Sequence, residues 1–137
     1  MLAHLLTVVG YIAATALVQG LSHFKINAAH YNAAGFFREV PIAPLGVLAM
    51  IVQGLILSLF YVRYVPGDSI SSALVIAWAF GAFLAAYMAF GLAGELKVPS
   101  VVSWITVELV AAVVQFTLIG LALWAAHHYA GSAAAVG

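Results

Sequence analysis

Glu108 stands alone among apolar residues in the stretch "SWITVELVAAVVQF", residues 103–116. A carboxyl group in such a helix is costly to bury unless another group pairs with it or hydrogen-bonds to it. Gln115 follows seven residues later and lies on the same helical face. The chain has only four Lys and Arg residues, and all of them lie outside its long apolar stretches. We therefore expect hydrogen bonds, rather than a salt bridge, to satisfy Glu108.

Other polar side chains are expected near Glu108. The first apolar stretch carries a polar stripe of Thr7, Tyr11, Thr15 and Gln19, spaced four residues apart. Its last members lie at about the depth of Glu108, as do polar residues of the other stretches, and we expect Glu108 to bond Gln19, Tyr87 or Gln53. The predicted polar cluster comprises Glu108, Gln19, Gln53, Tyr87, Gln115 and Thr15.

This cluster admits two interpretations. It could handle a proton or cation, or bind a polar ligand head group, because ionisable residues within membrane helices usually mark function. It could equally be structural, since hydrogen bonds between helices commonly hold membrane bundles together. The residues alone do not separate the two.

The five histidines are His4, His23, His30, His127 and His128, and all lie at helix ends or in the first connection. A bis-histidine haem would need ligands that face each other inside the bundle, and no carboxylate lies near to support a metal. His23 and His30, seven residues apart, are only weak metal candidates. His4 could meet the pair at 127 and 128. We predict no haem, metal or other cofactor.

The elements that must position these groups follow from composition. Charged residues make up 6% of the 137 residues and hydrophobic residues 66%, and the mean hydropathy is +1.18. This composition is typical of an integral membrane protein. About 20 apolar residues are needed to cross a bilayer as a helix, and four stretches qualify, at residues 2–22, 42–62, 69–94 and 100–127. We predict an all-α bundle of four transmembrane helices in one domain, residues 1–137.

Turn and capping residues fit these boundaries. Pro41 and Pro44 open the second span, Asp68 or Ser69 could cap the third, and Ser100 could cap the fourth. The first connection, "HFKINAAHYNAAGFFREVP", is the longest, and its mixture of aromatic and polar residues predicts a short helix lying at the membrane interface.

The cations predict the orientation. Lys25, Arg38 and Lys97 lie in the first and third connections, and Arg63 alone lies on the side that carries both termini. Because cytoplasmic loops are enriched in Lys and Arg, we expect both termini on the outer side, which labelling of single cysteines with an impermeant reagent tests. Aromatic side chains near the span ends predict an interfacial belt of Tyr61, Tyr64, Trp104, Trp124 and Tyr129.

Small residues predict how the helices pack. The third span repeats one every fourth position, at Ala77, Gly81, Ala85 and Ala89, and the second span offers Gly54. Because lipid gives no hydrophobic reward for helix association, such residues let backbones approach and gain dispersion contacts. The same faces could join helices within one chain or between subunits.

Several classes of function are excluded. A formal net charge of zero gives no basic surface for nucleic acid. The absence of cysteine excludes disulfides, thiolate zinc sites and iron–sulfur clusters. No base, nucleophile and orienting group form a catalytic set in the sequence, so an enzyme is not the expected reading.

The segments "PIAPLGVLAMIVQG" and "KVPSVVSWITVELVAAVVQFTLIG" resemble a group of small bacterial inner-membrane proteins with four spans. The resemblance implies the fold and that membrane, but no reaction and no site residues. The leading hypothesis is an accessory or scaffolding subunit of a membrane complex or homo-oligomer, in contact with lipids. The alternative is a small carrier or a lipid-, quinone- or proton-binding protein built around Glu108. A membrane enzyme or haem protein that uses the histidines is a weaker third reading.

Overall fold

The structure, a computed structural model, describes residues 1–65 and 69–135, with side chains described up to residue 130. The described residues form helices and connecting segments only. Four helical stretches are long and apolar enough to cross a membrane, which confirms the predicted fold class: Leu2–Ile26, Ala43–Tyr64, Ile70–Glu95 and Val101–Ala130. The helices in order are α1 (Leu2–Leu21), η1 (Ser22–Ile26), α2 (Ala28–Ala34), α3 (Ala43–Tyr64), α4 (Ile70–Ala85), η2 (Ala86–Gly91), α5 (Leu92–Glu95) and α6 (Val101–Ala135), where η marks a π-helical turn.

The first span is longer than predicted. It continues past residue 22 through η1, because the residues there include no glycine or proline to stop the helix. The chain turns at Asn27, whose φ and ψ of −114° and 21° are not helical, and α2 follows. A short helix in the first connection is therefore confirmed. It ends at Gly35, whose φ of 71° lies in the left-handed region that favours glycine.

The other helix ends mostly match the capping residues. Pro44 lies in the first turn of α3, and the Ser69 hydroxyl accepts a hydrogen bond from the Ser72 backbone N–H at 3.5 Å. The alternative cap, Asp68, lies outside the described residues. Ser100 accepts from the Ser103 N–H at 3.3 Å at the start of α6. That helix runs past the predicted end at residue 127 because no proline interrupts it.

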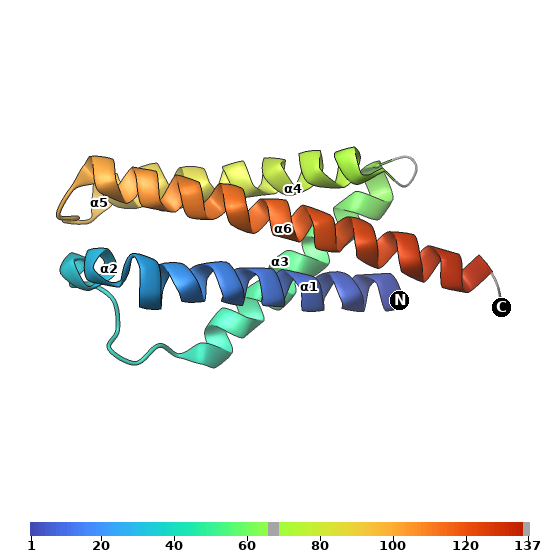
Figure 1. Ribbon diagram of the computed structural model, residues 1–137, viewed down its shortest axis with the longest axis horizontal. Helices are drawn as coiled ribbons and strands as arrows, with labels where there is room; N and C mark the ends of the chain where they lie inside the picture. Colours follow the sequence, from blue (N-terminus) through green and yellow to red (C-terminus); the bar gives the residue numbers. More distant parts are fainter. Residues whose placement is uncertain (66–68, 136–137) are drawn as a thin grey trace.

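α6 is the central helix of the bundle. It packs between α1 and α4, and α3 crosses the bundle obliquely and packs chiefly on α1 (Figure 1). The beginning of α1 and the end of α6 lie at one end of the molecule, with α2 and α5 at the other. The first turns of α3, residues 43–49, stand away from the other helices and are exposed at every position.

Small residues lie where the helices approach most closely. Ala77, Ala85 and Ala89 of the third span are buried. Gly81 faces Phe116 of α6, and a Cβ atom added at Gly81 would lie only 2.5 Å from the Phe116 Cγ atom. The ring therefore occupies the space that a side chain at residue 81 would need. Gly54 lies against α1 in a similar way, with Val8 and Tyr11 at 3.2 Å from such a Cβ.

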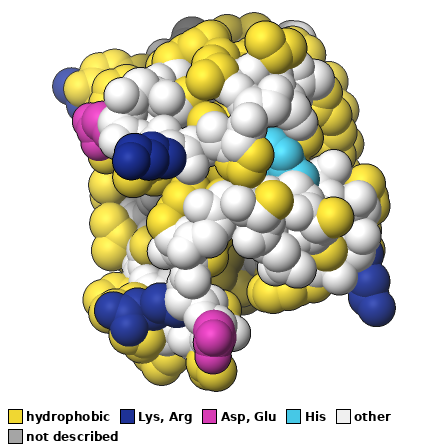
Figure 2. All heavy atoms as spheres, turned by 90° about the vertical axis from the view of Figure 1, so that its left-hand side faces the viewer, with side chains coloured by type: hydrophobic (Ala, Val, Ile, Leu, Met, Phe, Trp, Pro, Cys, Tyr) yellow, Lys and Arg dark blue, Asp and Glu magenta, His cyan; other side chains and the backbone are white. Residues whose placement is uncertain are grey.

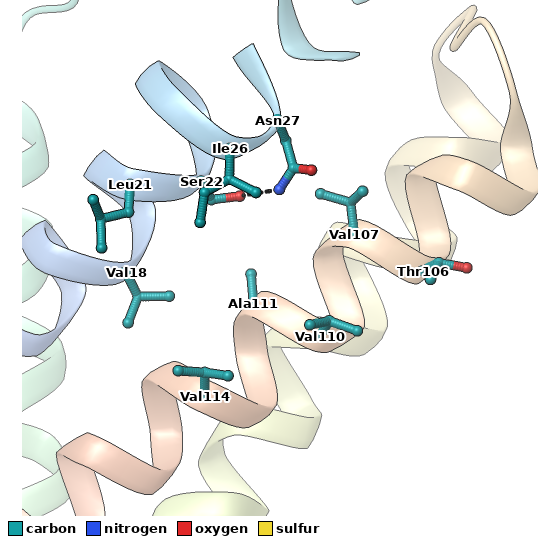
Figure 3. A pocket seen from close by; sticks show the side chains of 10 residues that line it. All are labelled: Val18, Leu21, Ser22, Ile26, Asn27, Thr106, Val107, Val110, Ala111 and Val114. Carbon is teal, nitrogen blue, oxygen red and sulfur yellow. Dashed lines mark hydrogen bonds between the residues drawn. The ribbon is translucent and has the colours of Figure 1, made fainter. Parts of the chain in front are cut away.

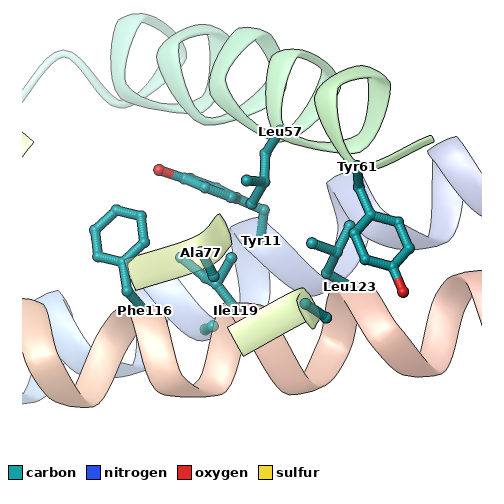
Figure 4. Close-up of a cluster of buried hydrophobic side chains, with 9 residues drawn as sticks. Tyr11, Leu57, Tyr61, Ala77, Phe116, Ile119 and Leu123 are labelled. Carbon is teal, nitrogen blue, oxygen red and sulfur yellow. The ribbon is translucent and has the colours of Figure 1, made fainter. Parts of the chain in front are cut away.

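A cluster of buried apolar side chains joins the four long helices near the middle of the bundle (Figure 4). Tyr11 comes from α1, Leu57 from α3, Ala77 from α4, and Ile119 and Leu123 from α6. These contacts set the mutual position of the helices and thereby of the polar groups that lie on either side of the cluster.

Charged side chains surround the end of the molecule formed by α2 and α5 (Figure 2). Lys and Arg side chains and acidic ones are spread around its rim, and a histidine shows between the helix ends. This distribution marks a polar boundary for the apolar body of the bundle, and the candidate site lies just beneath it.

Candidate functional site

Glu108 lies in α6, is only 6% exposed, and has a partner from the first connection. The Tyr31 hydroxyl of α2 donates to Glu108 Oε1 at 2.8 Å, and Tyr31 is itself buried. The expected partners, Gln19, Gln53 and Tyr87, are therefore not the observed one. The short helix α2 folds against the beginning of α6 and delivers a phenol to the carboxyl group.

Tyr31 belongs to a cluster of rings beside Glu108, here called the aromatic cap. Its members are Tyr31, Trp104, His30, Phe36 and Phe37. Trp104 lies one turn before Glu108 in α6, and its ring centroid is 5.9 Å from that of Tyr31 and 5.6 Å from those of His30 and Phe36. Its indole N–H donates to the Met88 carbonyl oxygen in η2 at 2.9 Å. Trp104 is completely buried and Tyr61 is buried as well, so these two members of the predicted interfacial belt face the other helices and not lipid.

The surroundings of Tyr31 keep its phenol protonated. Burial raises the pKa of Tyr31 far above its ordinary value of 10, a hydrogen bond with the Ser22 hydroxyl opposes that rise, and Glu108 adds to it. Burial has this effect because it disfavours the charged phenolate. At physiological pH Tyr31 is therefore a hydrogen-bond donor to Glu108.

One buried polar atom in this region, His30 Nε2, lacks a hydrogen-bond partner among the described residues. The bond between Tyr31 and Glu108 uses only one carboxyl oxygen, Oε1. The other ring nitrogen of His30, Nδ1, forms a hydrogen bond with Ser103 Oγ at 3.3 Å. His30 also lies close enough to Glu108 for an electrostatic interaction. Buried polar atoms without partners are rare in proteins and call for an explanation.

His23 and His30, the weak metal candidates, lie on two sides of Tyr31. The His23 ring stacks on that of Tyr31 with centroids 3.6 Å apart, whereas His30 contacts Tyr31 edge-on. They do not share one helical face, because Asn27 interrupts the helix between them. The described part of the chain contains no group of three or more His, Cys, Asp or Glu residues that could hold a metal ion.

The remaining members of the predicted cluster lie in separate places. Gln115 accepts from Gln19 Nε2 at 2.7 Å and donates to Thr15 Oγ1 at 3.1 Å, which joins α6 to α1. Gln53 Oε1 accepts from the Tyr11 hydroxyl at 2.9 Å, which joins α3 to α1. Tyr87 is 58% exposed on the outside of η2. The expected single cluster is thus divided into a group of three residues that joins α1 to α6, a pair that joins α1 to α3, the carboxyl site, and the exposed Tyr87.

A further polar cluster, not predicted as a site, surrounds Ser58 near the end that carries the N-terminus. Its hydroxyl lies 2.8 Å from His4 Nδ1, 2.9 Å from His127 Nε2 and 3.4 Å from Thr7 Oγ1. Thr7 donates its own proton to the Ala3 carbonyl, so it can accept from Ser58 while Ser58 accepts from both imidazoles. The expected meeting of His4 with the histidine pair occurs through this serine. Because Ser58 is fully buried, the cluster joins α1, α3 and α6 rather than presenting a nucleophile.

A groove of about 330 Å³ lies between the end of the first span and the neighbouring part of α6 (Figure 3). Val18 and Leu21 line one side, and Val107, Val110 and Val114 line the other. Asn27 donates to the Ser22 hydroxyl at 3.0 Å at one end of the groove. Its walls are apolar and fit a hydrocarbon chain rather than a charged group.

Comparison of the chain with protein-family models, with curated proteins and with solved structures finds no match in any of the three.

Proposed function

We propose that this small integral membrane protein binds and releases a proton at Glu108. The supporting observation is the pairing of a buried carboxyl group, about 10 Å inside α6 by helical rise, with the Tyr31 phenol beneath an aromatic cap. The bond to Tyr31 uses only one oxygen of this carboxyl group, Oε1. Close by, His30 Nε2 is buried without a hydrogen-bond partner among the described residues.

The chemistry of the three groups supports this role. The carboxylate form of Glu108 accepts a hydrogen bond from Tyr31, which stays protonated and neutral. The protonated form gains a donor, and His30 Nε2, which is buried without a partner among the described residues, can accept in the tautomer that donates from Nδ1 to Ser103. Both protonation states of Glu108 therefore have a possible partner, as a site that exchanges protons requires.

The Glu108→Gln variant tests the proposal. The chain contains only four Asp and Glu residues, so infrared titration of the protein in liposomes can resolve individual carboxyl groups. We expect a carboxyl band that titrates with pH while the bundle stays folded, is missing in Glu108→Gln, and has a different midpoint in Tyr31→Phe. Dye-monitored proton flux into the same liposomes should fall in Glu108→Gln.

Glu95→Gln is the matched control, because Glu95 is exposed in α5 and should leave the band and the flux unchanged. If Glu108 keeps one protonation state throughout the titration, and the proton flux is the same in Glu108→Gln and Glu95→Gln, the site is structural and the proposal fails.

A second candidate function, an accessory subunit, is favoured by one different observation. The first turns of α3, residues 43–49, are exposed on all sides and stand clear of the bundle. A neighbouring membrane helix from another subunit would fit beside them. Native mass spectrometry from mild detergent tests this candidate, since a protein that travels only as a monomer with lipid would contradict it.

A further inference from the structure

A second cavity, of about 260 Å³, lies where α1, α3, α4 and α6 meet, apart from Glu108. Aromatic rings form much of its wall: Tyr11, Phe80, Phe83 and Phe116. Phe83 is 80% exposed on the outside of α4. The wall of the cavity therefore continues onto the lipid-facing surface, and an apolar molecule could enter from the side.

The polar groups of this cavity are the Tyr11 hydroxyl and the Gln53 amide, which hydrogen-bond to each other. In Figure 4 the Tyr11 hydroxyl points away from Tyr61 and Leu123. Tyr11 donates to Gln53 Oε1, so the amide N–H₂ group of Gln53 keeps its donors, and it makes no hydrogen bond to any described residue. The cavity thus combines flat aromatic walls with one available hydrogen-bond donor.

The depth of this donor limits what can bind. Gln53 is the eleventh of the 22 residues of α3, and Tyr11 is the tenth of the 20 residues of α1. At about 1.5 Å per residue, both lie some 15 Å from the helix ends. Because the hydrocarbon core is about 30 Å thick, phospholipid carbonyls at its edge do not reach this level.

We propose that the cavity binds a membrane-soluble quinone, a flat ring that carries carbonyl acceptors and dissolves in the centre of the bilayer. The ring would lie among Phe80, Phe83 and Phe116, and one carbonyl oxygen would accept a hydrogen bond from Gln53 Nε2. Tyr11 orients the amide by holding its oxygen. The site is separate from Glu108, so either proposal can fail without the other.

Decylubiquinone, added to the protein in phospholipid nanodiscs, is the probe. We expect saturable binding, measured as quenching of tryptophan fluorescence and as a rise in the melting temperature. The Gln53→Met variant keeps the side-chain volume but removes the donor, and should weaken binding about tenfold, the effect of one lost hydrogen bond. Leu84→Trp, which fills the cavity from α4, should abolish saturable binding.

Two comparisons make the result specific. Gln19→Met introduces the same change at an amide outside the cavity and should bind like the wild type. Decylbenzene has a ring and tail without a carbonyl and should not compete with the quinone. The proposal is overturned by non-saturable partitioning, by equal affinity of Gln53→Met and wild type, or by competition from decylbenzene. If Gln53→Met does not fold, Leu84→Trp and the decylbenzene competition decide.

Discussion

Replacing Trp104 with alanine is expected to lower the free energy of unfolding by about 3–5 kcal/mol, the usual cost of removing a fully buried tryptophan. The Trp104 side chain is completely buried and contacts three rings of the aromatic cap besides Tyr31. Its loss would leave a void beside Glu108 and free the Met88 carbonyl. Titration with SDS in mixed micelles measures the change.

Two variants show whether burial is the cause. Trp104→Phe keeps an aromatic ring but loses the bond to Met88, and should cost less than the alanine variant. Trp78→Ala removes a tryptophan that is 47% exposed, and should cost less than about 2 kcal/mol because most of its surface stays outside the core. Equal losses for Trp78→Ala and Trp104→Ala would contradict the role given to the cap.

Replacing Ser58 with alanine should destabilise the bundle by about 2–3 kcal/mol. Three hydrogen bonds converge on this hydroxyl, and an interhelical bond in a membrane protein is worth about 0.6 kcal/mol on average, with a maximum near 1.7. The variant also takes a hydrogen-bond partner from the His4 ring, which adds the cost of leaving a partly buried polar atom without that bond. The same SDS titration measures it.

Thr106→Ala is the control for Ser58→Ala. Thr106 is exposed, and its hydroxyl bonds only the Val102 carbonyl of its own helix, so its loss should change stability by less than about 0.5 kcal/mol. Combining Ser58→Ala with His4→Phe should then cost less than the sum of the two single changes, because the two side chains interact directly. Strict additivity would show that the cluster does not act as a unit.

The number of helices and most of their ends follow from the sequence, because span length and capping residues are local properties. The site does not follow in the same way. Depth in the bilayer was enough to relate Gln19 to Gln115, but not to pair Glu108 with Tyr31. That contact depends on how α2 folds back against α6. The mixed aromatic and polar residues of the first connection do not predict against which helix α2 packs.

Rotation of each helix about its axis explains the other differences. Tryptophan is a residue type that favours the membrane interface. Trp104 nevertheless shares a helix face with Glu108, one turn away, and both side chains point into the bundle. Tyr87 lies at a suitable depth but on the outward face of η2. A helix without a strong polar side gives little evidence of its rotation, and the apolar surroundings in lipid supply none.

The polar stripe of α1 has its partners spread over two other helices. Thr7 bonds Ser58 of α3, and Tyr11 bonds Gln53 of α3. Thr15 and Gln19 both bond Gln115 of α6. The ribosome makes α1 before α3 and α6, so the polar groups of α1 are synthesised before their partners. The hydrogen bonds of α1 are therefore complete only once α6 has been made, and the nascent chain carries the cost of unpaired polar groups until then.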